Sequence, residues 1–180
     1  SKIAEINPNI FDEAFKNHDI LVVAGFQGIN EDFELTTLGR GGSDTTAVAL
    51  AASNQTPCEI YTDVDGVYAT DPRILNEAKR LEYVSYEEMM EMSALGAGVL
   101  ETRSVELAKN YDIPLYLGRT LSNVKGTWIM SRSDLLEKKA VTGVALDQHM
   151  MHVTITYPLP DNQLLTQLFT ELEMGSVNVD

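Results

Sequence analysis

The chain has 180 residues, of which 44% are hydrophobic, and its formal net charge is −14 at pH 7. This length and apolar content suffice for a packed core, whereas the negative charge argues against nucleic acids and anionic membranes as partners, because both would repel the protein. No apolar run approaches about 18 residues and no basic segment leads into one at the N-terminus, so we expect no membrane span, no signal peptide and a soluble, cytoplasmic protein.

Short apolar runs alternate with helical patterns along residues 1–130. Residues 20–24 (ILVVA) are continuously apolar and largely β-branched, which predicts a strand buried on both faces. The small residues 47–52 indicate a helix that packs closely on a sheet, with Ser43 or Asp44 as its N-cap. Residues 58–64 (CEIYTDV) predict a second strand, which starts at the single cysteine, Cys58. A lone cysteine excludes an internal disulfide framework, and we expect its thiol to be buried.

The middle of the chain begins with a helix-capping signal, SYEE, at residues 85–88. It predicts a helix on which Met89, Met92, Val99 and Leu100 share one face. We interpret the glutamates among residues 87–91 as a solvated helix face and predict no metal site. A helix at residues 104–111 and strands at residues 113–117 and 126–130 follow. This alternation indicates an α/β domain with a largely parallel sheet.

The pattern restarts after a charged stretch, residues 131–139 (SRSDLLEKK), which we interpret as a linker. Residues 151–157 alternate between apolar and polar side chains, as in a half-exposed strand. Residues 164–172 carry a helical apolar stripe, Gly175 is a candidate C-terminal cap, and residues 177–180 begin another strand. The last part of the chain is therefore predicted to be a small βαβ unit.

Three glycines, an arginine and an aspartate lie within the six residues from Gly39 to Asp44. Glycines let backbone N–H groups approach a ligand, and a following helix favours anions. The loop lacks the lysine of a P-loop and the third glycine of the dinucleotide fingerprint, which excludes both motifs. A nucleophile elbow at Ser43 stays open, although Thr45 replaces its final glycine. A helix-capping turn would explain the glycines and the aspartate but not Arg40.

Two carboxylates, Asp63 and Asp65, follow the second predicted strand. An EF-hand calcium loop is excluded, because Val67 and Tyr68 stand where that loop needs an oxygen ligand and a glycine. One interpretation is a hairpin that turns at Asp65. The other is a ligand site at the carboxyl edge of a parallel sheet, where Asp63 would bind a ribose hydroxyl or a metal-bound water. Arg73, nearby, is either a surface residue or a phosphate ligand.

Five stretches together resemble the amino acid kinase family and, within it, the aspartate kinases: VVAGFQG, TTLGRGGSDTTAVALA, YTDVDGVYATDPR, SALGAGVL and KNYDIPLYL. The segment from residue 141 onward resembles the start of an ACT regulatory domain. The resemblance implies an incomplete three-layer αβα sandwich with a largely parallel sheet at residues 1–130 and a linker at residues 131–140. The beginning of a ferredoxin-like βαβ ACT domain would follow at residues 141–180.

The resemblance also implies an activity, the transfer of the γ-phosphoryl group of ATP, with Mg²⁺, to the β-carboxylate of L-aspartate. This reaction gives 4-phospho-L-aspartate and is the first step in the synthesis of lysine, threonine and methionine. Arg40 matches the residue that holds the substrate's α-carboxylate, and Asp44 matches the one that holds its ammonium group. The substrate-binding positions are Arg40, Gly41, Gly42, Ser43 and Asp44, and the nucleotide-binding positions are Thr62, Asp63, Tyr68 and Arg73.

The chain departs from the family pattern at two places. Gly98 stands where many members have a lysine near the nucleotide, and the family's N-terminal Lys-Phe-Gly-Gly motif is absent. We therefore expect a fragment without activity of its own, from a homo-oligomeric enzyme that binds lysine or threonine at its ACT domains. A kinase for glutamate or a nucleotide, and a noncatalytic regulatory chain that binds an amino acid effector, are the alternatives.

Overall fold

The computed structural model describes residues 3, 6, 8–131, 141–146, 154 and 162–175, and the chain divides into two compact units, Ser1–Asp147 and Gln148–Asp180. The first unit contains a four-stranded sheet in the order β3-β5-β6-β4, formed by Cys58–Thr62, Leu115–Arg119, Thr127–Met130 and Tyr83–Ser85. The β3–β5 and β4–β6 pairs are parallel, whereas β5 and β6 are antiparallel. The predicted α/β class with a largely parallel sheet is confirmed.

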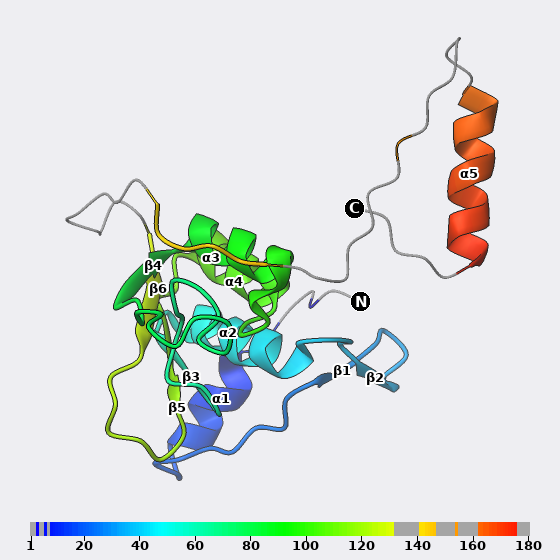
Figure 1. Ribbon diagram of the computed structural model, residues 1–180. Helices are drawn as coiled ribbons and strands as arrows, with labels where there is room; N and C mark the ends of the chain where they lie inside the picture. Colours follow the sequence, from blue (N-terminus) through cyan, green and yellow to red (C-terminus); the bar gives the residue numbers. More distant parts are fainter. Residues whose placement is uncertain are drawn as a thin grey trace. The chain divides into compact units, whose positions relative to one another are not determined.

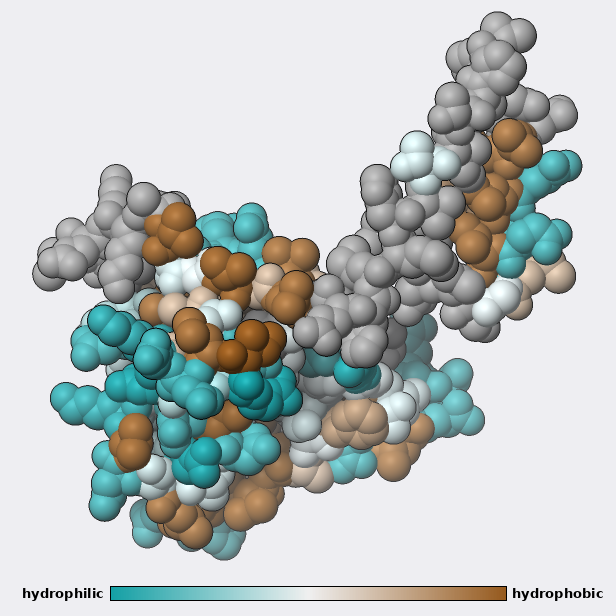
Figure 2. All heavy atoms as spheres, viewed as in Figure 1, coloured by the Kyte–Doolittle hydropathy of each residue, from teal (hydrophilic) through white to brown (hydrophobic). Residues whose placement is uncertain are grey.

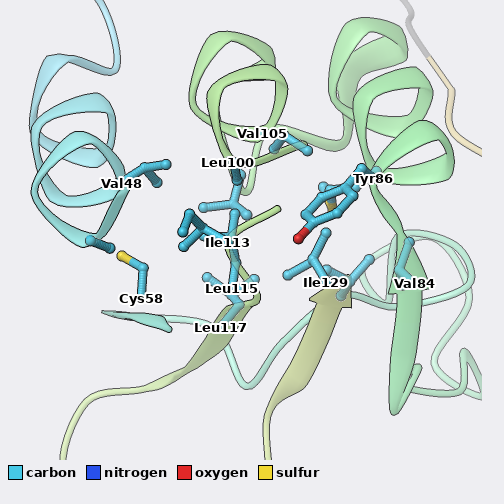
Figure 3. Close-up of a cluster of buried hydrophobic side chains, with 14 of the residues drawn as sticks. Val48, Cys58, Val84, Tyr86, Leu100, Val105, Ile113, Leu115, Leu117 and Ile129 are labelled. Atoms are coloured by element: carbon cyan, nitrogen blue, oxygen red, sulfur yellow. The ribbon is translucent and has the colours of Figure 1, made fainter. Parts of the chain in front are cut away.

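Three helices of the first unit pack together over the sheet: α2 (Gly42–Asn54), α3 (Tyr86–Met92) and α4 (Thr102–Tyr111). α4 contacts both α2 and α3, and the three lie side by side in Figure 1. Figure 3 shows Val48 of α2 and Val105 of α4 on the helical side of the core, facing Leu115 and Ile129 of the sheet. All four side chains are fully buried, so the core lies between the helices and one face of the sheet.

Most predicted strands of this unit are confirmed within two residues. β3 begins at Cys58, whose side chain is buried, and burial raises the pKa of its thiol to about 11, with smaller contributions from the charges of Asp44 and Glu59. β5 begins at Leu115 and not at Ile113, because the N–H of Ile113 donates to the Ala108 carbonyl at 2.9 Å. The backbone at Ile113 thus still belongs to the end of α4.

The prediction of a buried strand at residues 20–24 is wrong. These residues form no strand, and the side chains of Ile20 and Val22 are 81% and 95% exposed. A strand needs the N–H and C=O groups of a neighbouring strand. Within the described part of the chain, the four-stranded sheet is completed by β3 at one edge and β4 at the other, and neither edge pairs with this run. Apolar composition by itself therefore does not produce the strand.

The capping box at the start of α3 is confirmed. The Ser85 hydroxyl accepts a hydrogen bond from the Glu88 N–H, and the Glu88 carboxylate accepts one from the Ser85 N–H. The predicted length of this helix is wrong, because α3 ends at Met92 and is followed by the π-helical turn η1 (Ser93–Ala97). Gly96 has φ 101°, a left-handed value that interrupts the helix. Leu100 is buried as expected, but from the segment after this break.

A β-hairpin that the sequence did not predict precedes α2. Strands β1 (Gln27–Ile29) and β2 (Leu35–Thr37) pair in antiparallel fashion, and the helix α1 (Pro8–Phe15) lies earlier in the chain. At the tip of the hairpin, Phe33 has φ 63° and is 82% exposed. Its N–H donates to the Asn30 carbonyl at 3.1 Å, which closes the turn. Turns of this kind favour glycine at the left-handed position, so an exposed phenylalanine there is strained.

Replacing Phe33 by glycine is expected to stabilise the first unit by about 0.5–1 kcal/mol. Glycine removes the left-handed penalty of about 1–2 kcal/mol, and its larger unfolded-state entropy offsets part of that gain. The matched control is Phe33→Ala, which removes the exposed ring but keeps the strained backbone. Urea unfolding of both variants gives the comparison, and a Phe33→Gly protein less stable than Phe33→Ala would contradict the assignment of strain.

The second unit contains one described helix, α5 (Asn162–Met174), which confirms the predicted helical stripe. Figure 2 shows an apolar band beside a hydrophilic one along α5. The N–H of Gly175 donates to the Glu171 carbonyl at 2.9 Å and closes the last turn.

The predicted strands at residues 151–157 and 177–180 and the linker at residues 131–139 fall outside the described residues, apart from Ser131 and Thr154. In the described part of the chain, no helix combines the length and apolar character that a membrane crossing requires.

Residues 141–146 are attached to the first unit. The Val144 N–H donates to the Ala69 carbonyl at 2.7 Å, and the Thr142 hydroxyl donates to Glu88 Oε1 at 2.5 Å. A Cβ at Gly143 would lie 2.9 Å from the Ala69 carbonyl oxygen, so only a glycine fits this approach without displacing its neighbours. The assignment of these residues to an ACT domain stays a prediction.

Candidate functional site

The glycine-rich loop connects β2 to α2 and owes its shape to two glycines. Gly39 and Gly41 have φ 80° and 64°, left-handed values that other residues rarely adopt. Gly41 is the N-cap of α2, so the prediction that Ser43 or Asp44 caps the helix is wrong. Ser43 lies inside the first turn of α2 and outside the left-handed region, which removes the strained turn of a nucleophile elbow.

The start of α2 is closely packed against residues 25–28, the GFQG segment. A Cβ at Gly42 would lie 2.7 Å from Cδ2 of Phe26 and 3.0 Å from Cβ of Leu38. The Phe26 N–H donates to the Thr46 hydroxyl at 3.2 Å, and the Leu38 N–H donates to the Phe26 carbonyl at 2.9 Å. These contacts pack the start of α2 against this segment and leave no room for a side chain at Gly42.

The sequence predicted Arg40 as a charged residue of this loop but did not predict the partner of its side chain. The Arg40 side chain is 94% exposed, and its Nε is 3.3 Å from Oε1 of Glu101, the N-cap residue of α4. Partial burial raises the pKa of the Asp44 carboxyl, and the negative charge of Glu101 raises it further. Glu101, a residue that the sequence did not predict, thus pairs with Arg40 and acts electrostatically on Asp44. No local signal identifies Glu101, because the contact joins segments about sixty residues apart.

The predicted nucleotide-binding residues begin where β3 ends. The Thr62 hydroxyl accepts a hydrogen bond from the Val64 N–H at 3.0 Å, and its carbonyl accepts one from the Thr120 N–H at 2.9 Å. Asp63 is exposed at the same strand end. The hairpin interpretation is wrong, since β3 pairs in parallel with β5 and Tyr68 bridges to Arg80. The carboxylate therefore lies at the carboxyl edge of parallel strands.

Two further arginines are paired with carboxylates, Arg119 at the end of β5 and Arg73 in the segment after β3. Arg119 of β5, another residue that the sequence analysis missed, donates from Nε to Oδ1 of Asp65 at 2.7 Å. Arg73 donates from Nε and Nη2 to both oxygens of Asp71, at distances from 2.7 to 3.1 Å. These hydrogen bonds hold the pKa of the Asp71 carboxyl below its usual value. Arg73 is thus a surface residue paired with its neighbour in this structure, and an incoming anion would have to compete with Asp71.

The structure also shows which cationic groups and metal ligands the described residues offer to a phosphate. Gly98, where the resemblance expects a lysine, is exposed and has φ 57°, so a lysine there would be strained. Among the residues that the structure describes, no three His, Cys, Asp or Glu side chains form a group suited to a metal ion. Arg40, Arg73 and Arg119 are each in contact with a carboxylate.

Comparisons with known proteins show which family the sequence matches. The sequence model described as the amino acid kinase family matches residues 1–119. Aspartokinase 2 of Bacillus subtilis is 45% identical over 181 residues, an alignment that covers 100% of this chain and 44% of the relative. The chain therefore spans less than half the length of that protein.

Two solved structures share the fold. E. coli aspartokinase III in complex with aspartate and ADP has a TM-score of 0.63 and 30% identity, covering 87% of this chain and 35% of its own. The same enzyme in complex with lysine and aspartate has a TM-score of 0.55 and 38% identity, covering 61% of this chain and 25% of its own.

Proposed function

Because the chain belongs to the amino acid kinase family, we propose that it is part of an aspartate kinase that transfers the γ-phosphoryl group of MgATP to the β-carboxylate of L-aspartate. The observation that carries this proposal is the placement of Arg40 on the glycine-rich loop and of Asp44 in the first turn of the helix that follows, where a cation and an anion can meet the two charged groups of an α-amino acid. The similarity to aspartokinases over the whole chain supports it.

In the proposed complex, the planar guanidinium of Arg40 would hold the α-carboxylate of aspartate through two hydrogen bonds. Asp44 would hold the ammonium group, and the backbone of Gly41, Gly42 and Ser43 would line the substrate. The substrate's β-carboxylate oxygen then attacks the γ-phosphorus, the bond to the β-phosphate oxygen breaks, and ADP leaves. A carboxylate is already a nucleophile, so the protein's contribution is chiefly positioning and charge neutralisation.

For the nucleotide, we propose Thr62, Asp63, Tyr68 and Arg73, of which Thr62 and Asp63 lie where β3 ends. Mg²⁺ would enter with ATP, held mainly by its phosphates. The exposed Asp63 carboxylate at the end of β3 suits a ribose hydroxyl or a water on that ion. Arg73 would serve the phosphates after releasing Asp71.

Residues 141–180 would begin an ACT domain, which in the whole protein binds lysine or threonine and pairs with another copy. The lysine complex of E. coli aspartokinase III supports an amino acid effector. We also propose a cytoplasmic location. The 180-residue chain by itself is proposed to be inactive.

The test is an assay of the longest protein that the surrounding reading frame encodes. With MgATP and L-aspartate, hydroxylamine should trap an acyl phosphate, whereas L-glutamate and uridine monophosphate should give little product. Trapping with glutamate or phosphorylation of the nucleotide would identify a different amino acid kinase. Binding of lysine or threonine without any transfer would identify the noncatalytic regulatory alternative.

Replacing Asp63 by alanine is expected to weaken ATP binding about tenfold or more while aspartate binding changes little. The reason is the loss of a charged hydrogen-bond acceptor, worth about 1.5–3 kcal/mol, at the edge assigned to the nucleotide. Titration calorimetry with a nonhydrolysable ATP analogue and with aspartate measures both affinities. Asp12→Ala, at an exposed site on α1, is the control. Equal losses for both ligands would remove Asp63 from the nucleotide site.

A further inference from the structure

The start of α4 contacts the glycine-rich loop at two places. Glu101, its N-cap residue, lies with Oε1 3.3 Å from Nε of Arg40. Two residues later, Arg103 donates from Nη1 to the Leu38 carbonyl at 3.2 Å. One contact therefore involves the guanidinium proposed to bind substrate, and the other involves the backbone just before it. The position of the loop depends on the first turn of α4.

Glu101 is packed directly against the loop. A Cβ at Gly41 would lie 2.1 Å from Cγ and 2.5 Å from Cβ of Glu101, so the absence of a side chain at Gly41 makes room for it. Glu101 makes no side-chain hydrogen bond that caps its own helix. Its carboxylate instead lies beside Arg40, where a carboxylate of the substrate would have to bind.

We propose that Glu101 is a positioning residue that holds Arg40 in the free protein and must exchange with the α-carboxylate of the substrate, so that it sets the affinity for the amino acid. This inference rests on the proposed function, because it assigns the substrate carboxylate to Arg40. The negative charge of Glu101, 3.3 Å from Nε of Arg40, compensates the guanidinium and repels a second carboxylate, so the substrate displaces Glu101 when it binds. Glu101 thereby lowers the affinity for aspartate while keeping the Arg40 side chain near the loop.

Glu101 should also affect the pH dependence of substrate binding, because its charge acts on Asp44. Burial raises the pKa of the Asp44 carboxyl most strongly, and Glu101 of α4 raises it further. From β3, Cys58 also faces this carboxyl, and its thiol stays neutral near pH 7 because its pKa is raised to about 11. Asp44 must be ionised to hold an ammonium group. Removing the charge of Glu101 lowers the pKa of Asp44, so substrate binding should persist to a lower pH.

The experiment is steady-state kinetics of Glu101→Gln in the longest protein that the reading frame encodes. We expect the KM for aspartate to fall about two- to fivefold, the effect of removing one exposed ion pair. The kcat and the KM for ATP should stay constant, and the acidic limb of kcat/KM for aspartate should move to lower pH. Glu106→Gln, at an exposed position on the same helix, should match the wild type in all four quantities.

An unchanged or raised KM for aspartate would overturn the inference, and an unmoved acidic limb would overturn the coupling between Glu101 and Asp44. A failure of the proposed function has a different signature, since the wild type itself would then not phosphorylate aspartate. In that case an NMR titration of the Asp44 carboxyl carbon in wild type and Glu101→Gln still tests the contact. A lower pKa in the variant supports the placement of Glu101, and identical titrations overturn it.

Discussion

The 180-residue chain by itself is expected to phosphorylate aspartate at least about a thousandfold more slowly than an intact aspartate kinase. Transfer of a phosphoryl group between two anions requires both charges to be neutralised at once. The resemblance assigns part of that task to a lysine in a Lys-Phe-Gly-Gly motif, which this sequence does not contain. Gly98 stands where a second lysine is common, and Arg73 is bonded to Asp71.

The exposed apolar residues of the first unit add to this expectation. Ile20 and Val22 are almost fully exposed, although their sequence suits a buried strand. An apolar run left in solvent favours association between molecules, and an unpaired sheet edge does the same. The chain by itself should therefore combine an incomplete set of cations with a tendency to associate, and weak nucleotide binding is the most it should retain.

The measurement is trapping of the acyl phosphate with hydroxylamine at saturating MgATP and aspartate. The purified 180-residue chain is compared with the longest protein that the reading frame encodes, at equal active concentration checked by size-exclusion chromatography. Turnover comparable to that of the longer protein would show that the missing lysine motif is dispensable. It would also show that the cations of the transfer site lie within this chain.

The second large effect is expected for Arg40→Ala in the longer protein, where kcat/KM for aspartate should fall about tenfold to a hundredfold. The substrate carboxylate would lose a charged hydrogen-bonded pair, worth about 1.5–3 kcal/mol. The stability of the protein should change by less than about 1 kcal/mol, because Arg40 is 94% exposed and its pair with Glu101 lies at the surface. A loss of activity can therefore be assigned to binding and not to unfolding.

Arg40→Lys is the matched control, since it keeps the positive charge but loses the planar fork that binds a carboxylate with two hydrogen bonds. We expect it to retain an activity between those of the wild type and Arg40→Ala. The KM for ATP should be the same in all three proteins. Wild-type kinetics with aspartate in Arg40→Ala would remove this residue from the substrate site, and an equal rise in both KM values would place it between the two substrates.

The sequence by itself determined the features whose causes lie within a few residues. The capping box of Ser85 and Glu88 is a local hydrogen-bonded unit, so its four-residue signal predicts the start of α3 correctly. The apolar stripe of α5 and the strand that begins at Cys58 follow from periodicity and side-chain shape in the same way. The composition of the glycine-rich loop also predicts its position, because the left-handed backbone at Gly39 and Gly41 favours glycine.

Only the tertiary structure decided the features that depend on a distant partner. Residues 20–24 have the composition of a buried strand, but strand formation depends on hydrogen bonds to a neighbour, and β3 and β5 pair with each other instead. The pairing of Arg40 with Glu101, and of Arg119 with Asp65, joins segments more than fifty residues apart, for which no local pattern exists. Packing between α4 and the glycine-rich loop therefore decides which carboxylates surround the proposed substrate site, because electrostatic interactions depend on distance in space and not along the chain.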